Sequence, residues 1–514
     1  MVRFSLRIMR TAIISWVAGL IFLLVVYPAS FVAQFDDLAE RTALVTTSQN
    51  SGGINALYGT PQLPGYLGQV TSWEGGTYLL ILSGVAAILL ASKHMCAEGD
   101  ELVAPLGGSP ADLVRSAAQV GLALAAGLAL AMTATMVVIN TVWGEFPLEG
   151  SLTLSLLIGA SFASFFFITM FFGLLTADRK TARQLGFITL ALAVVLRAVA
   201  NSADLDWLSW ATPIGWLDIA LPFTDDDIRP LLVTAGIILL TGGAARALAS
   251  SMEFRQQVVG RDRAHGSYRP PGNVLRLLVR DHRASLIIWT VVILGFAAYM
   301  ASLIQTIVDL LADKPSWATY FGLGEDVFVE FTVFITGFVS ILTSCAAVQF
   351  ISALGAEETS GRLEQLLGAA ATRRDILTRV LAATIAFASV LCLATGLITA
   401  ATVEAVSDQP VLAEGLIIGL SSIPGTVVFI GLGAALLAGR VSWRVGTWVL
   451  IAAAAVVTIL GRTLSLPDWL VNLSPFEYTG SAGSTHVLAW TILLAITAAA
   501  AALALYRYPR RDIA

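Results

Sequence analysis

Twelve long apolar runs restrict the folds that this chain can adopt. Each run is long enough to cross about 30 Å of hydrocarbon as a helix. Their approximate limits are 11–33, 76–92, 114–140, 151–175, 184–201, 229–249, 284–305, 327–353, 376–402, 411–438, 445–462 and 486–506. Helices satisfy their backbone polar groups within one segment, as a bilayer requires. With 57% hydrophobic and only 13% charged residues, the chain is predicted to be an all-α integral membrane protein with twelve transmembrane helices.

The distribution of charge predicts how these spans are oriented. When the N-terminus is placed in the cytoplasm, 25 of the 30 Lys and Arg residues fall in cytoplasmic segments. The outer segments then hold 22 of the 35 Asp and Glu residues. Cytoplasmic loops of membrane proteins carry such an excess of basic residues. We therefore expect a multi-pass protein of a bacterial plasma membrane with both termini in the cytoplasm.

An arginine-rich pattern occurs twice, once at the start of the chain and once near its middle. The spacing R-x3-R-x2-R-x5-W ends at Trp16 in the first copy and at Trp289 in the second. The arginines concerned are Arg3, Arg7, Arg10, Arg276, Arg280 and Arg283. They are candidates for amphipathic helices on the inner leaflet, where basic side chains meet anionic lipid. They could equally do no more than follow the general excess of basic residues on the inner side.

Two further motifs recur at an offset of 262 or 263 residues. A capping box opens the third span of each half, at Ser109 with Asp112 and at Thr372 with Asp375. The tripeptide Asp-Trp-Leu precedes the last span of each half. This duplication predicts two six-span halves of parallel orientation, related by a pseudo-twofold axis along the membrane normal. The predicted boundaries are 1–250 and 276–514, joined by a basic cytoplasmic linker at 251–275.

The outer segments predict a gate. In each half, Asp-Trp-Leu is followed by Ser/Thr-Pro and then by an aromatic residue. The candidate gate residues are Pro213, Trp216, Pro475 and Tyr478. Proline breaks a helix, so we expect broken or re-entrant hairpins whose Trp and Tyr side chains rest at the membrane interface. The first outer loop, 34–75, shows no clear helical period and is expected to complete the gate.

Eight charged residues stand close together in the stretch 356–379, which must therefore lie outside the hydrocarbon. On a helix, Leu363, Leu366 and Leu367 would form one apolar stripe. Glu358 and Arg362 would pair on another, exposed face at a spacing of i, i+4. The pattern predicts an amphipathic surface helix that leads into the span opened by the second capping box.

Motifs for catalysis are missing from the sequence. None of the three lysines stands in a phosphate-binding loop. The four histidines and three cysteines show no metal spacing. We therefore expect no enzyme activity, metal or cofactor in this chain, and any ATP hydrolysis must come from another polypeptide. Arg197 and Arg462 lie near the outer ends of spans, where an arginine can pair with a nearby acid, face a cavity or extend to the interface.

The charged stretch also carries a family resemblance. The signature E-E-x-x-G-R-x-E-x-L-L is present at 357–367, and together with the two-times-six layout it resembles ABC exporter permeases of the polyketide-antibiotic (tetronasin-type) group, within the type 2 ABC permeases. The resemblance implies that this segment is the coupling helix that docks on a cytoplasmic ATPase. The implied docking residues are Glu357, Glu358, Gly361, Arg362, Leu363, Glu364, Leu366 and Leu367.

The equivalent segment of the first half departs from that signature. It keeps Glu98, Glu101 and Leu106 but has no arginine and places Pro105 in the middle. The resemblance thus implies one degenerate and one complete docking element, and two copies of a partner ATPase that binds ATP and Mg. Hydrophobic or amphipathic compounds would be the substrates, membrane lipid would be the other partner, and no nucleic acid is expected.

Two other functions remain open at this point. The chain could be a proton-coupled secondary multidrug transporter, although nearly all of its acids map to loops rather than to mid-span positions. The acidic pair Asp36 and Asp37 after the first span has the position used by polyprenyl-dependent membrane glycosyltransferases. The charged helix expected at 356–367 favours an exporter powered by a separate ATPase over both alternatives.

Overall fold

The computed structural model describes most of the chain. The described residues are 2–35, 37–49, 54–55, 58–96, 109–176, 179–203, 205–251, 274–305, 308, 326–359, 372–460, 467–482 and 486–511. Regular structure within these ranges is helical, without a strand. Twelve of the helices described are long and apolar enough to span a membrane, and each coincides with one of the predicted apolar runs. The prediction of an all-α protein with twelve transmembrane helices is confirmed.

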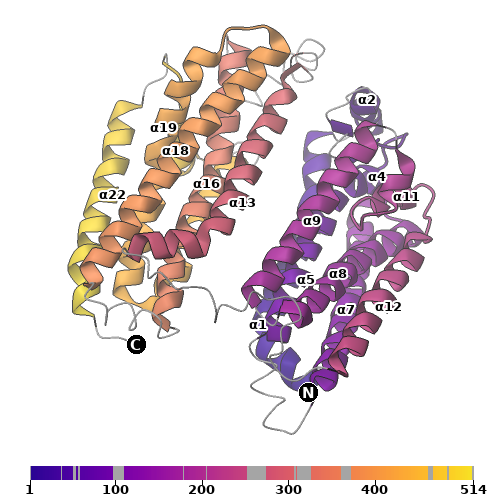
Figure 1. Cartoon of the computed structure of the whole chain (residues 1–514). Helices are drawn as coiled ribbons and strands as arrows, with labels where there is room; N and C mark the ends of the chain where they lie inside the picture. Colours follow the sequence, from indigo (N-terminus) through magenta and orange to yellow (C-terminus); the bar gives the residue numbers. More distant parts are fainter. Residues whose placement is uncertain are drawn as a thin grey trace. The chain divides into compact units, whose positions relative to one another are not determined.

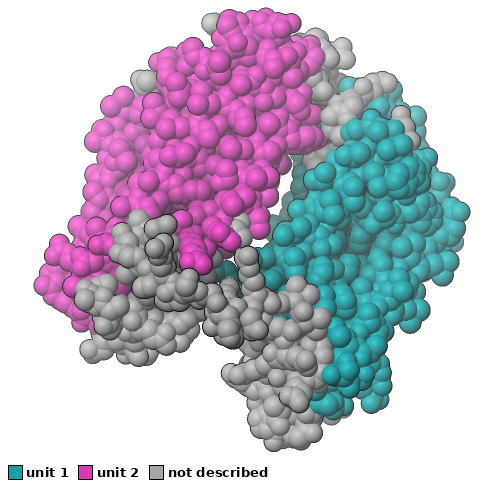
Figure 2. All heavy atoms as spheres, viewed as in Figure 1, with its two compact units in different colours: residues 1–266 teal, residues 267–514 magenta. Residues whose placement is uncertain are grey.

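The chain divides into two compact units, 1–266 and 267–514 (Figure 2). Each unit contains six of the candidate spans. The parallel pseudo-twofold relation between the halves stays a prediction, as do the three boundaries drawn from the sequence. We call the end of each unit that the charge distribution predicts to be cytoplasmic its inner end, and the opposite end its outer end.

Six long helices form the frame of the N-terminal unit (Figure 1). They are α1 (Val2–Gln34), α5 (Gly76–Cys96), α7 (Pro110–Trp143), α8 (Leu148–Thr176), α9 (Arg179–Ser202) and α12 (Pro230–Ala249). Short helices cover the outer end: α2 (Leu38–Gln49), α4 (Leu67–Val70), the π-helical segment η1 (Thr71–Gly75), α10 (Asp206–Ser209) and α11 (Trp216–Ala220). The short helices place polar side chains above the spans.

The C-terminal unit repeats this pattern. Its long helices are α13 (Val274–Ser302), α16 (Val327–Thr359), α18 (Arg373–Ser407), α19 (Leu412–Gly439), α20 (Arg444–Leu460) and α22 (Val487–Arg507). Its short helices are η3 (Val441–Trp443), α21 (Asp468–Val471), η4 (Pro475–Tyr478) and η5 (Tyr508–Arg510). In both units the second and fourth spans are the most enclosed ones, namely α5 with α8 and α16 with α19.

Small residues allow the enclosed spans to pack closely. Gly396 of α18 faces Gly415 and Gly419 of α19, and a Cβ atom on Gly396 would lie only 2.7 Å from the backbone nitrogen of Gly419. Membrane helices use such small residues to bring two backbones together, because lipid offers no hydrophobic drive for helix association. Any larger residue at Gly396 would push α18 and α19 apart.

Both predicted capping boxes are present. The Ser109 hydroxyl accepts a hydrogen bond from the Asp112 backbone at 3.3 Å, and Pro110 occupies the first turn of α7. The Thr372 hydroxyl accepts from the Asp375 backbone at 3.1 Å and opens α18. These caps satisfy backbone donors that have no partner within their own helix.

The expectation of a non-helical loop at 34–75 is wrong. Residues Leu38–Gln49 form α2, and the second span begins at Leu67 rather than at 76. Helix α2 is polar, and long-range contacts hold it in place. The guanidinium of Arg41 bonds Glu145 at 2.9 Å, and Val45 is fully buried. Such contacts between distant residues leave no periodic pattern in the local sequence.

The arginine-rich segments are continuous with spans. Helix α1 begins at Val2, and α13 begins at Val274, so neither segment forms a separate helix. Figure 1 shows the first turns of α13 lying across the unit before the helix turns to run along its neighbours. The side chains of Arg7, Arg10, Arg280 and Arg283 are exposed, and those of Arg3 and Arg276 lie outside the described part. Their contact with lipid stays a prediction.

Candidate functional site

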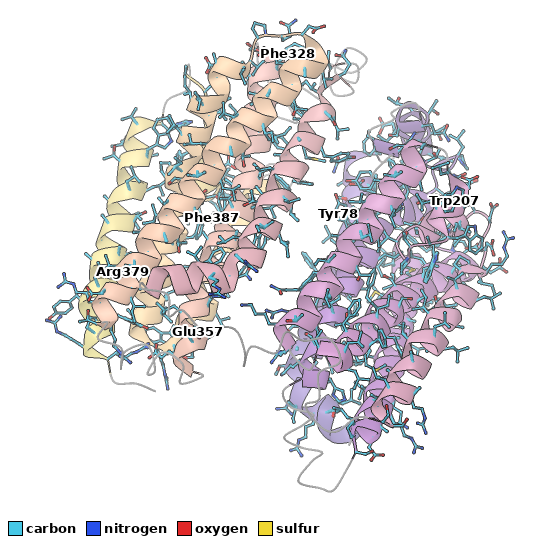
Figure 3. All side chains as sticks on the ribbon, in the orientation of Figure 1. Tyr78, Trp207, Phe328, Glu357, Arg379 and Phe387 are labelled. Atoms are coloured by element: carbon cyan, nitrogen blue, oxygen red, sulfur yellow. The ribbon has the colours of Figure 1, made fainter. Side chains whose placement is uncertain are left out.

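The last turn of α16 carries the first two residues of the predicted coupling segment. The helix runs unbroken to Thr359, beyond the expected end of its span at 353. Glu357 and Glu358 therefore belong to the span helix itself and not to a separate surface helix. Figure 3 shows Glu357 at one end of the C-terminal unit, opposite the end that carries Phe328.

Glu358 is buried, contrary to the expectation that it lies on an exposed face. Glu358 is only 3% exposed. One carboxylate oxygen accepts a short hydrogen bond from Arg511 and lies 3.7 Å from a guanidinium nitrogen of Arg373. The Tyr508 hydroxyl donates to the other oxygen at 3.5 Å. Two arginines from distant parts of the sequence thus neutralise this carboxylate, which a spacing rule within one helix cannot reveal.

The same arginines also bind backbone carbonyl groups near the end of α22 and of α19. Arg373 donates to the carbonyl oxygen of Arg511 at 2.7 Å, and Arg511 donates to that of Leu437 at 2.6 Å. Both guanidinium groups lie over the Tyr508 ring, at 5.6 and 5.5 Å from its centre. We call Glu358, Arg373, Tyr508 and Arg511 the inner cluster. It joins the end of α16 to the start of α18 and the end of α22.

The other predicted docking residues lie outside the described residues. They are Gly361, Arg362, Leu363, Glu364, Leu366 and Leu367 of the second half and Glu98, Glu101 and Leu106 of the first. The proposed pair between Glu358 and Arg362 is therefore untested. Among the described residues, no group of three His, Cys, Asp or Glu side chains could hold a metal ion.

The outer segments contain broken hairpins. In the N-terminal unit, α10 and α11 stand between α9 and α12, and in the C-terminal unit, α21 and η4 stand between α20 and α22. Pro213 is buried, and Pro475 begins η4. Each predicted interruption is present, whereas the role of these residues in a gate stays a prediction.

The two aromatic residues of the predicted gate differ in their surroundings. Trp216 is fully buried, so its expected place at the membrane interface is wrong. Its indole nitrogen donates to the Trp210 carbonyl at 3.1 Å, which turns the side chain inward. Tyr478 is half-buried and donates to the Asn472 carbonyl at 2.6 Å. The tryptophans of the two Asp-Trp-Leu tripeptides, Trp207 and Trp469, are strongly exposed.

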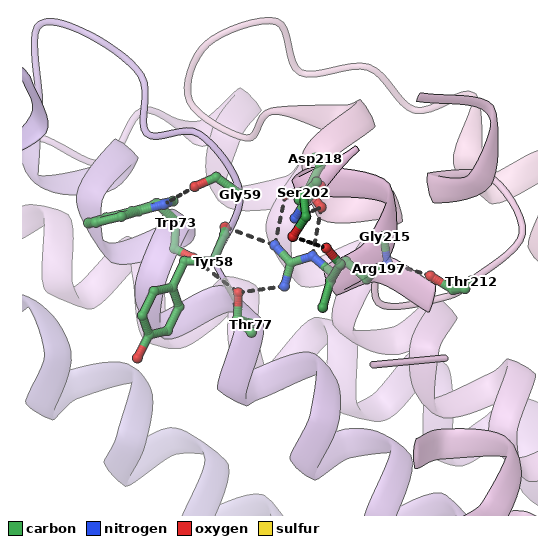
Figure 4. Close-up of polar contacts among 11 residues, drawn as sticks. Tyr58, Gly59, Trp73, Thr77, Arg197, Ser202, Thr212, Gly215 and Asp218 are labelled. Carbon is green, nitrogen blue, oxygen red and sulfur yellow. Dashed lines mark hydrogen bonds and ion pairs between the residues drawn. The ribbon is translucent and has the colours of Figure 1, made fainter. Parts of the chain in front are cut away.

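Arg197 holds the outer end of the N-terminal unit together (Figure 4). It is only 1% exposed and binds Asp218 through two hydrogen bonds of 2.6 and 2.7 Å. It also donates to the Thr77 hydroxyl at 2.8 Å and to the Tyr58 carbonyl at 2.9 Å. Of the alternatives that the sequence left open for Arg197, the structure shows pairing with an acid. One side chain of α9 thereby joins α5, α11 and the first outer segment, which we call the outer anchor.

Gly59 lets the first outer segment approach this anchor. Its φ angle is +77°, which favours glycine, and a Cβ atom there would overlap the Asp218 carboxylate. The Trp73 indole donates to the Gly59 carbonyl at 2.7 Å. The backbone at 58–59 is thus fixed from two sides, by Arg197 and by Trp73.

Comparisons with known proteins agree with this architecture. Residues 272–508 match the family model described as the C-terminal domain of the multidrug efflux system permease Rv1217c. The chain is also 27% identical to the multidrug efflux system permease protein Rv1217c of Mycobacterium tuberculosis over 546 aligned residues, which cover 100% of this chain and 94% of that relative. The chain is homologous to a multidrug efflux permease. The alignment spans both units.

Proposed function

We propose that this chain is the transmembrane permease subunit of an ATP-driven ABC exporter. The full-length homology to a multidrug efflux permease supports the exporting role, and the signature at 357–367 supports a separate ATPase. The proposed substrates are hydrophobic or amphipathic compounds, taken from the cytoplasm or the inner leaflet of a bacterial plasma membrane. Two copies of a separate cytoplasmic ATPase bind ATP and Mg and supply the energy.

The inner cluster could transmit a movement of the coupling segment to the spans that it joins. A docked ATPase moves the coupling segment, and that segment follows directly from the last turn of α16. Glu358 joins this turn to α18 through Arg373 and to the end of α22 through Arg511. A displacement of the segment would therefore move three spans together. ATP binding shifts the equilibrium between inward and outward states only by its differential affinity for them.

One copy of this chain should bind two copies of the ATPase, because each half supplies one docking element. We expect the complex purified through a tag on this chain to have the native mass of a 1:2 assembly. Native mass spectrometry in a mild detergent measures this directly. A stable 2:2 assembly would contradict the proposed arrangement, and a chain that never co-purifies with an ATPase would contradict the proposed function.

A further inference from the structure

A carboxylate lies among tyrosines at the outer end of the N-terminal unit. Glu74 belongs to η1, the π-helical segment that joins α4 to α5. Such π-helical turns often mark functional sites, because they shift side chains out of the regular register. Tyr78 follows Glu74 by four residues, so both occupy the same face of the second span. Figure 3 places Tyr78 on α5.

Three tyrosine rings and one indole ring pack against one another beside η1. The Tyr78 ring stacks on that of Tyr27 at 6.0 Å and meets Tyr58 edge-on at 5.9 Å. Tyr58 in turn meets the Trp73 ring edge-on at 5.7 Å. The Tyr58 and Tyr78 hydroxyl groups share a hydrogen bond of 2.7 Å. All four rings are half-buried, so each keeps some surface for a ligand.

The outer anchor fixes one of these rings. Figure 4 shows the Tyr58 carbonyl turned toward Arg197 and its ring directed away from it. The arginine of a buried ion pair therefore holds the backbone that carries this ring. Burial, with smaller contributions from Tyr78 and Glu74, raises the pKa of Tyr58, so its hydroxyl remains neutral. The aromatic cluster is thus a rigid, uncharged surface beside one acid.

Glu74 has no hydrogen-bond or ion-pair partner among the described residues, although it is half-buried. The next residue, Gly75, packs on the Tyr27 ring so closely that a Cβ atom there would lie 2.9 Å from it. Arg197, the nearby buried cation, is already paired with Asp218. Burial of a carboxylate carries a free-energy cost for its ionised form unless a cation pairs with it. An arriving cation would relieve that cost.

We propose that Glu74, Tyr27, Tyr58 and Tyr78 form a binding site for an organic cation. The faces of aromatic rings attract ammonium-like groups by about 0.5–2 kcal/mol each. The carboxylate attracts a cation electrostatically and gives no such attraction to a neutral compound. Lipophilic cations are therefore the substrate class that this site selects. The site's role in transport rests on the proposed exporter function, whereas its binding of a cation does not.

Binding to the purified chain tests the site without any ATPase. The probe is radiolabelled tetraphenylphosphonium, measured by equilibrium dialysis against the full chain in lipid nanodiscs, with empty nanodiscs subtracted. Glu74→Gln should weaken binding about tenfold, a loss of about 1.4 kcal/mol. Tyr78→Leu should also weaken it, whereas Tyr78→Phe, which keeps the ring, should retain most of the affinity.

A matched control removes a charge of the same kind elsewhere. Glu149→Gln neutralises an exposed acid at the start of α8, in the same unit, and should leave the affinity for tetraphenylphosphonium unchanged. The neutral compound triphenylphosphine oxide should bind wild type and Glu74→Gln equally. Equal affinity of both proteins for the cation, or an equal loss for the neutral compound, would overturn the site. Failure of the wild-type chain and its ATPase to export any compound would instead overturn the proposed function and leave the binding result standing.

Discussion

Replacing Arg197 by methionine should lower the free energy of unfolding by about 3–5 kcal/mol, the usual cost of removing one partner from a buried ion pair. The change leaves the Asp218 carboxylate without its guanidinium, with a side chain only 18% exposed. It also removes the donors to Thr77 and to the Tyr58 carbonyl. Unfolding of the purified protein in mixed SDS micelles measures the loss.

Two further variants show whether the ion pair is the cause. Arg197→Met combined with Asp218→Leu should recover part of the lost stability, because an apolar pair often replaces a buried ion pair without cost. Arg229→Met removes an exposed arginine whose hydrogen bond lowers the pKa of Asp227, and it should change stability little. If Arg197→Met is no more harmful than Arg229→Met, the outer anchor does not hold this end of the unit together.

Reversing the charge of Arg362 should reduce ATP-driven transport at least tenfold while leaving the protein folded. Interface energy concentrates in a few residues, each of which costs about 2 kcal/mol or more when lost. An exposed charge contributes only about 0–1 kcal/mol to stability. Arg362→Glu should therefore be expressed and inserted normally. The measurement is export at matched expression, together with the thermal stability of the purified chain.

Glu358 provides the contrasting variant. Glu358→Arg would place a third positive charge in the inner cluster beside Arg373 and Arg511, so it should cost at least about 3 kcal/mol of stability as well as transport. Glu98→Lys in the degenerate first-half element should do less damage to transport than Arg362→Glu. Full export by Arg362→Glu would contradict the docking role, and equal losses in Glu98→Lys and Arg362→Glu would contradict the asymmetry between the halves.

The spans and their caps could be predicted because their signals are local. An apolar run of sufficient length specifies a membrane helix, and Ser109 or Thr372 followed three residues later by an acid specifies where one begins. The sequence places Arg197 near the outer end of a span, where ionisable residues are functional candidates, but it does not identify Asp218 as the partner. These features depend on residues within a few turns of one another.

The contacts that organise the two candidate sites are not local. Glu358 bonds Arg511 across 153 positions of sequence, and Arg197 bonds the Tyr58 carbonyl across 139. A spacing rule selected Arg362 for Glu358 because it considers one helix alone. Helix α2 was missed for the same reason, since tertiary contacts and not an apolar period stabilise it. Glu74 falls within the first outer loop of the sequence prediction, because the apolar run of the second span begins only at residue 76.

Transport into inside-out membrane vesicles tests the proposed function most directly. The vesicles contain this chain with its partner ATPase, and the readout is uptake of a fluorescent lipophilic compound. We expect uptake to begin on addition of ATP with Mg, to persist when an uncoupler collapses the proton gradient, and to stop when the ATPase carries a substitution of its catalytic glutamate. Uptake driven by an imposed proton gradient in vesicles without the ATPase would contradict the account and identify a secondary transporter.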